Sequence, residues 1–220
     1  MNSSADKVLT YAIHDVTPYI NWIYFFHAWG FQPRFAAIAD IHGCDACRAS
    51  WLTTFSEDDR AKAAEAMQLL KEANRMLNQL DETYHVHTIF RLCKANADGD
   101  NLLLDGTRLP LLRQQIPHPD GSPFLCLSDF VRPLASGTPD TVGIFAASCD
   151  GEVELLYEDD PYKRMLVQTL ADRLAEAATE KMHEYVRKVA WGYAKDENLS
   201  IPELLKADSY THLRAHETGA

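Results

Sequence analysis

The sequence predicts a single α+β domain with a mostly antiparallel sheet. One reason is an amphipathic stretch, residues 159–191 of the 220, that is long enough to span a domain of this size. Another is the central region, residues 85–147, where apolar residues change from helical spacing to alternation. No internal repeat or convincing linker interrupts residues 10–208. Helices towards both ends with short strands between them are typical of this fold class.

Two helices are expected before the strands. The first covers residues 17–30, with Thr17 as its cap and Pro18 in its first turn. Its residues are apolar almost all the way round, so we expect burial on most sides. The second follows the capping residue Ser56 and continues through an apolar stripe to Asp81.

The central strands are separated by turn signals. Asp98-Gly99 and Asp105-Gly106 are dipeptides that favour tight hairpin turns. The first strand has alternating, β-branched residues and carries His85 and His87 on one face, where hydrogen bonding to protein or solvent is the favoured interpretation. The expected strands are residues 85–92, 101–104, 107–112, 124–127 and 141–147.

The long helix begins at a strong signal, the capping residue Asp160 followed by Pro161. A buried stripe recurs at steps of three and four residues: Met165, Leu166, Thr169, Leu170, Leu174, Ala177, Ala178, Met182, Tyr185, Val186 and Val189. A shorter helix, residues 200–205, follows it, with Ser200 as cap and Pro202 in its first turn.

The other face of the long helix is acidic. Asp172, Glu176, Glu180 and Glu184 follow one another at four-residue spacing, and we call this set the acidic ridge. Like charges at this spacing repel by a few tenths of a kcal/mol per pair. A solvated face explains the pattern, and so does a docking surface for a cation or an imidazole. The pattern alone favours the solvated face, where only Glu184 has a clear helical partner, in Lys188 or Arg187.

Composition excludes several classes of partner. The formal net charge of −11 leaves no basic patch for nucleic acid and disfavours an anionic membrane surface. The five cysteines indicate reduced thiols and a cytoplasmic location rather than a disulfide framework. The N-terminus lacks the blocks of a signal peptide, and no apolar run reaches the ~18 residues of a membrane span.

Few residues suggest chemistry directly. His42, Cys44 and Cys47 are close enough in sequence for a metal, but no fourth ligand is evident because Asp45 is a poor candidate. No bound metal is therefore predicted. Asn21 is a polar residue among aromatics, either a satisfied amide or a ligand contact. No phosphate-binding loop, dinucleotide fingerprint or hydrolase motif occurs, so no catalytic residue is assigned.

Several segments together resemble the C-terminal, S-adenosylmethionine-binding activation domain of cobalamin-dependent methionine synthase. They occur in that family's order between Thr17 and Leu205: PYINW, FFHAW, LLKEANRMLNQL, FLCLSDFVRP, DTVGIFA, DDPYKRMLVQTLADRLAEA, MHEYVRKVAWGY and DENLS. The resemblance implies a curved α+β domain with a bent antiparallel sheet flanked by helices.

The resemblance also implies a function. Such a domain binds S-adenosylmethionine and docks on a partner protein that carries the cobalamin. An electron from a flavodoxin-like donor and a methyl group from S-adenosylmethionine then restore methylcobalamin. The protein supplies position and electrostatics rather than a catalytic base, so the chain is part of a methyltransferase system.

The resemblance assigns three residues. Asn21 occupies the position of an aspartate that contacts S-adenosylmethionine in the family, and the amide keeps hydrogen bonding without the charge. Asp172 and Glu176 match the acidic pair that receives the cobalamin-ligating histidine after it leaves the cobalt.

The two ends of the chain depart from the family. Residues 1–208 correspond to the N-terminal two-thirds of an activation domain, and residues 209–220 resemble a translated sequencing adaptor. We therefore expect a stand-alone, truncated module that acts in trans and binds S-adenosylmethionine poorly. The alternatives are a non-catalytic interaction protein that retains the docking surface and a small metal-binding protein that uses His42, Cys44 and Cys47.

Overall fold

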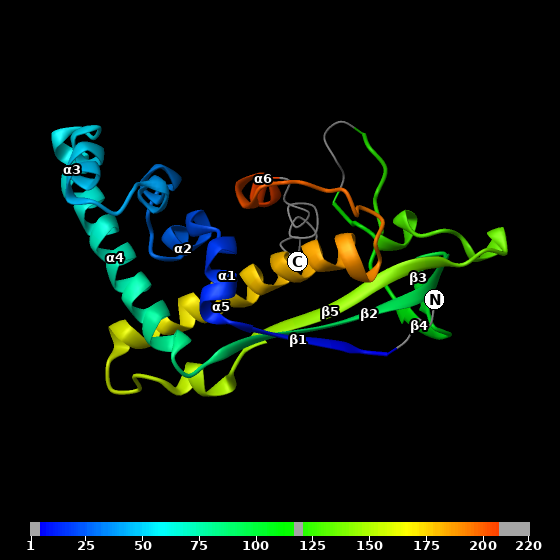
Figure 1. Ribbon diagram of the computed structural model, residues 1–220. Coiled ribbons are helices and arrows are strands. Elements are labelled where there is room, and N and C mark those ends of the chain that lie inside the picture. Colours follow the sequence, from blue (N-terminus) through cyan, green and yellow to red (C-terminus); the bar gives the residue numbers. More distant parts are fainter. Residues whose placement is uncertain (1–4, 117–120, 207–220) are drawn as a thin grey trace. The chain divides into compact units, whose positions relative to one another are not determined.

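The computed structural model describes residues 5–116 and 121–206 (Figure 1). The adaptor-like tail predicted at residues 209–220 lies outside the described residues. The strands are β1 (Lys7–Ala12), β2 (His85–Asp98), β3 (Asn101–Leu104), β4 (Thr107–Pro110) and β5 (Asp140–Cys149). The α-helices are α1 (Ile13–Val16), α2 (Trp22–Ala28), α3 (Asp45–Thr53), α4 (Glu57–Asp81), α5 (Pro161–Tyr185) and α6 (Ile201–Lys206).

The chain divides into two compact units. The first contains the described residues of Met1–Val8, Ile89–Ala146 and Pro202–Ala220, and we call it the sheet unit. The second contains Leu9–Thr88 and Ala147–Ile201, and we call it the helical unit. Each unit is built from segments that are distant in sequence, which explains why no linker marks a boundary between them.

The sheet is organised around β2, which pairs with β1, β3 and β5, while β4 pairs with β3. The β2–β3 and β3–β4 pairs are antiparallel, with Asp98 opposite Asn101 and Leu104 opposite Thr107. Asp105 and Gly106 both have positive φ, 48° and 87°, as a two-residue hairpin turn requires. The α+β class and the bent antiparallel sheet predicted from the sequence are confirmed.

The helical unit packs α4, α5 and the N-terminal helices around one apolar core. Both long helices begin at the predicted caps. The Ser56 side chain accepts a hydrogen bond from the Asp59 amide at 3.3 Å, and the Asp160 side chain accepts one from the Lys163 amide at 3.1 Å. The largest fully buried residues of this core are Phe25, Phe26, Ile13, Leu80, Leu166, Leu170, Leu174, Val16, Val86, Val153 and Val167.

Several predicted elements differ from the structure. The helix expected from Thr17 starts at Trp22 instead, because residues 17–19 form a 3-10 turn and Asn21 caps α2. The strand expected at residues 124–127 is absent there, and a 3-10 turn follows at Leu127–Phe130. Elements β1 and α3 were not predicted, because six and nine residues are too few for a periodic pattern to distinguish a strand from a helix.

The buried stripe of α5 is rotated slightly from the predicted one. Met165 is 45% exposed and Val189 is 62% exposed, whereas Val167, which was not assigned to the stripe, is fully buried. The last turn, Val186–Ala190, is a π-helix, which widens the helix and shifts the register of its final residues. No helix among the described residues is both long enough and apolar enough to cross a membrane.

Candidate functional site

The first predicted site residue, Asn21, has a structural role at the start of α2. Its Oδ1 atom accepts a hydrogen bond from the Ile23 amide at 3.1 Å, which satisfies one of the free N–H groups of the helix end. The residue is half-buried. Its side-chain NH₂ group has no protein partner among the residues that the structure describes. The amide therefore has donors to offer a ligand, while its acceptor is already used.

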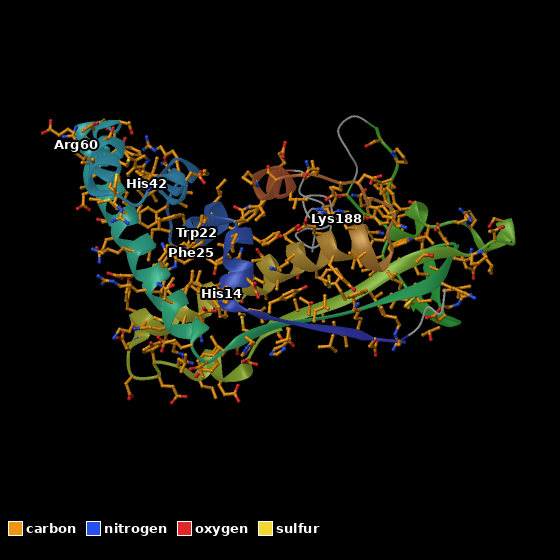
Figure 2. The ribbon with its side chains drawn as sticks, in the orientation of Figure 1. His14, Trp22, Phe25, His42, Arg60 and Lys188 are labelled. Carbon is orange, nitrogen blue, oxygen red and sulfur yellow. The ribbon has the colours of Figure 1, made fainter. Side chains whose placement is uncertain are left out.

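The segment before Asn21 is fixed to the C-terminal half of α5. The Tyr19 hydroxyl donates a hydrogen bond to Glu184 Oε2 at 2.6 Å, and Lys188 Nζ lies 2.6 Å from the other carboxylate oxygen. Lys181 adds a second link, because its Nζ donates to the Asp15 carbonyl at 2.9 Å. Figure 2 shows Lys188 near the end of α5. These contacts fix the segment that precedes Asn21 to a half-buried cluster of charged residues on the C-terminal half of α5.

Burial and hydrogen bonds act on the protonation of Glu184 and Tyr19. Burial alone raises the pKa of Glu184, but hydrogen bonds from Lys188 and Tyr19 outweigh it and hold that pKa below its ordinary value. Burial and the bond to Glu184 raise the pKa of the Tyr19 hydroxyl. Both groups thus keep their usual protonation states at neutral pH, with Tyr19 as donor and Glu184 as ionised acceptor.

The acidic ridge of α5 does not form a uniform surface. Asp172 is exposed, whereas Glu176 forms an ion pair with Arg173 at 2.8 Å and is 39% exposed at its side chain. The Nε atom of Arg173 is buried without a hydrogen-bond partner, so the guanidinium is held in place mainly by packing and by Glu176. The sequence interpretation missed this partner for Glu176. It correctly gave Lys188 to Glu184, while Arg187 pairs with Glu197 at 2.8 Å instead.

Helix geometry also separates the members of the ridge. Each step of four residues turns by about 40° around an α-helix, so Glu184 lies roughly 120° around the helix from Asp172. The rise of ~1.5 Å per residue puts Glu184 about 12 Å further along the axis than Glu176. The Tyr19–Glu184 bond thus brings the segment just before Asn21 to Glu184, whereas Asp172 and Glu176 lie at other positions along and around α5.

A second polar cluster was only partly foreseen. His87 Nε2 lies 2.7 Å from Asp150 Oδ1, and Thr10 Oγ1 lies 3.1 Å from His87 Nδ1. The His85 amide donates to the other Asp150 oxygen at 2.8 Å. The hydrogen-bonded interpretation of His85 and His87 is confirmed. Asp150 was missed because it is distant in sequence; it follows the last residue of β5, and the pairing of β5 with β2 brings it near the two histidines.

The three possible metal ligands of the sequence do come together. One donor atom from each of His42, Cys44 and Cys47 lies within 4.8 Å of the others. Cys44 caps α3, and its Sγ accepts a hydrogen bond from the Cys47 amide at 3.3 Å. Hydrogen bonds with the Cys47 thiol and with His42 lower the pKa of the Cys44 thiol to about 7.

The helical unit also has a cavity of about 410 Å³ between α4 and the start of α5. Its lining includes Glu72, Arg75, Gln79, Tyr157 and Tyr162. The Tyr162 hydroxyl donates to Glu72, which closes part of the wall with an internal bond. None of the sequence-predicted site residues lines this cavity.

Comparison with known proteins identifies the family. The family model for the activation domain of vitamin B12-dependent methionine synthase matches residues 12–216. A similar solved structure is the crystal structure of the MetH reactivation domain bound to AdoHcy, with a TM-score of 0.74 and 32% sequence identity. The match covers 94% of this chain and 62% of that one, so this chain spans less than two-thirds of its relative.

The described residues form an α+β module with a long capped helix that carries an acidic ridge. The comparisons are specific: the chain belongs to the family of vitamin B12-dependent methionine synthase activation domains. The resemblance stated from the sequence segments is confirmed.

Proposed function

We propose that this chain acts as a reactivation module for a cobalamin-dependent methionine synthase. In this role it binds an S-adenosylmethionine-type ligand and docks on the cobalamin-carrying protein during reductive methylation. The observation that carries the proposal is the acidic pair Asp172 and Glu176. Both residues are accessible to solvent on α5, one of the two longest described helices, in a chain of this family. A flavodoxin-like protein is the electron donor that we propose.

The described residues suit the ligand only in part. Asn21 has NH₂ donors for a carboxylate or hydroxyl oxygen, but its acceptor caps α2 and it carries no charge to pair with an ammonium group. A ligand contact through Asn21 is therefore weaker than one through an aspartate. This supports the expectation that the chain binds S-adenosylmethionine poorly.

The acidic pair suits docking of a cationic side chain. Asp172 and Glu176 are four residues apart, so their carboxylates lie on neighbouring turns of one face. Arg173 holds Glu176 in one orientation, whereas Asp172 is free to move to an incoming imidazolium. A protonated histidine between the two would make charge-assisted hydrogen bonds, which are stronger than neutral ones.

The chemistry itself belongs to the bound groups. S-adenosylmethionine supplies a methyl group from its sulfonium, and one electron from the donor makes the cobalt nucleophilic. The protein side has two tasks in this scheme: to hold the ligand near α2 and to stabilise the displaced imidazolium at α5. Neither task needs a proton-transfer residue, in agreement with the absence of catalytic motifs in the sequence.

Docking is tested with the double variant Asp172→Lys and Glu176→Lys and a cobalamin-loaded cobalamin domain from a methionine synthase. We expect the affinity measured by calorimetry to fall at least tenfold, since each reversal replaces attraction with like-charge repulsion. The control is Glu57→Lys and Asp58→Lys, exposed acidic residues in the first turn of α4. Equal affinity of both variants would reject the docking role.

Ligand binding is tested separately, with S-adenosylhomocysteine as the probe. Calorimetry on the 220-residue chain should give weak but saturable binding. Docking without binding of the probe would favour the alternative, an interaction protein that retains only the surface. A chain that neither docks on the cobalamin domain nor binds S-adenosylhomocysteine would refute the reactivation role.

A further inference from the structure

A cluster of soft ligands lies in the helical unit, at the start of α3 and outside the residues assigned to reactivation. We propose that His42, Cys44 and Cys47 form a binding site for a thiophilic divalent cation, with Zn²⁺ as the ion that the donor set suits. One coordination position would remain open to water or to an external ligand. This inference is independent of the proposed function.

The geometry of the three donors is close to that of a bound ion. Zinc–sulfur bonds of ~2.3 Å and zinc–nitrogen bonds of ~2.0 Å place tetrahedral donors about 3.5–3.8 Å apart. The three donor atoms already lie within 4.8 Å of one another. Side-chain movements of about 1 Å therefore close the site. The backbone does not have to refold, because Cys44 and Cys47 are fixed on one helical turn.

The ligands are positioned by local structure. Cys44 is the N-cap residue of α3, and Cys47 is three residues further along, so both sulfurs face the same end of the helix. The Cys47 amide already donates a hydrogen bond to Cys44 Sγ at 3.3 Å, an interaction that stabilises a metal-bound thiolate. His42 lies in the segment that leads into α3, as Figure 2 shows, and its imidazole reaches back to the sulfurs.

Charge and donor type select the class of ion. Two thiolates and a neutral imidazole carry a charge of −2, which balances a divalent cation. Thiolate sulfur is a soft ligand that favours zinc over magnesium or calcium. His42 is exposed and both cysteines are half-buried, so an ion can enter from solvent.

The fourth position is not filled by a described residue. No other histidine, cysteine or acidic residue in the described part of the chain joins the group of three. Asp45 is adjacent in sequence, but its side chain is fully exposed and lies 4.0 Å from Arg48. Three protein ligands with one open position are typical of zinc sites that bind an exchangeable group.

The test is a Co²⁺ titration of the 220-residue chain, reduced with a non-thiol reductant. We expect thiolate-to-cobalt charge-transfer absorption that saturates at one equivalent and disappears when Zn²⁺ is added. Cys44→Ser and Cys47→Ser should each weaken binding by at least about tenfold. Zn²⁺ should also raise the unfolding temperature of the wild type but not that of Cys47→Ser.

Matched controls separate this site from general metal binding. Cys149→Ala removes another half-buried cysteine, and His27→Ala removes another exposed histidine; both variants should bind cobalt as the wild type does. Absence of charge-transfer absorption in the reduced wild type would overturn the proposal. So would undiminished binding by Cys44→Ser, or a reduced chain that binds no cobalt and forms a Cys44–Cys47 disulfide on mild oxidation.

Discussion

The link between Tyr19 and Glu184 should be important for the stability of the region around Asn21. In Tyr19→Phe the ring remains and only the hydroxyl is lost, together with its 2.6 Å hydrogen bond to the carboxylate. Hydrogen bonds to charged groups contribute roughly 1.5–3 kcal/mol. Lys188 still pairs with Glu184 at 2.6 Å, so the carboxylate keeps one partner. We therefore expect a loss of about 1–2 kcal/mol, near the lower end of that range.

The assay is urea unfolding followed by tryptophan fluorescence at pH 7, with thermal unfolding as a second measure. For a chain of this size a loss of 1–2 kcal/mol lowers the unfolding temperature by about 2–8 °C. Tyr84→Phe is the control, because Tyr84 is also half-buried and its hydroxyl has no partner among the described residues. The control should change the free energy of unfolding by less than about 0.5 kcal/mol.

The pH dependence gives a second constraint. Because the pKa of Glu184 is lower in the folded chain than its ordinary value of 4.5, its ionised form stabilises the fold above that pH. This stabilisation is lost as the pH falls through the folded pKa. The difference between wild type and Tyr19→Phe should therefore be full at pH 7 and shrink below about pH 4. A difference equal to that of Tyr84→Phe, or one unchanged in acid, would refute this reasoning.

Three further predictions test the helical unit by urea unfolding, the first of them with a matched control variant. Leu170→Ala removes a fully buried side chain of α5 and should lower the free energy of unfolding by about 2–5 kcal/mol. Met165 is exposed on the same helix, so Met165→Ala should lower it far less. Similar losses would contradict the assigned core face. Ser56→Ala removes the cap of α4 and should cost about 1 kcal/mol; no loss would mean that the cap bond is not formed in solution. Burial raises the pKa of Asp150, but hydrogen bonds from His87 and the His85 amide outweigh it, so the pKa in the folded chain is below its ordinary value. The ionised carboxylate therefore stabilises the fold, and this stabilisation disappears as the pH falls through the folded pKa. Asp150→Asn should make the loss of stability in acid smaller, and an unchanged acid profile would exclude this role.

Local signals predicted the parts of the fold that depend on neighbours in sequence. Asp160 followed by Pro161 located the start of α5, Ser56 located the start of α4, and the Asp-Gly dipeptides located the hairpin turns. These predictions succeed because the hydrogen bonds of caps and turns join atoms that are within three or four residues of each other. Thr17 failed for a related reason, since its hydroxyl bonds to the Ile13 carbonyl and the capping position passes to Asn21.

The candidate site was less accessible to sequence reasoning. Asn21, Asp172 and Glu176 were selected because the chain resembles a family, and their roles in ligand binding and docking stay predictions. The contact between Tyr19 and Glu184 joins residues 165 positions apart, so no local pattern could indicate it. The same holds for His87 and Asp150, which are 63 positions apart.

The sequence by itself determined the fold class, the two long helices and the family, since periodicity, caps and ordered segments are properties of the chain. Only the tertiary structure decided how the charges on α5 are used. It left Asp172 exposed, paired Glu176 with Arg173, and bonded the half-buried Glu184 to Tyr19 and Lys188. It also brought one donor atom each of His42, Cys44 and Cys47 within 4.8 Å. The physical reason is that a charged or metal-binding group interacts with whatever lies near it in space. Spacing in the sequence determines such neighbours only within one turn of a helix.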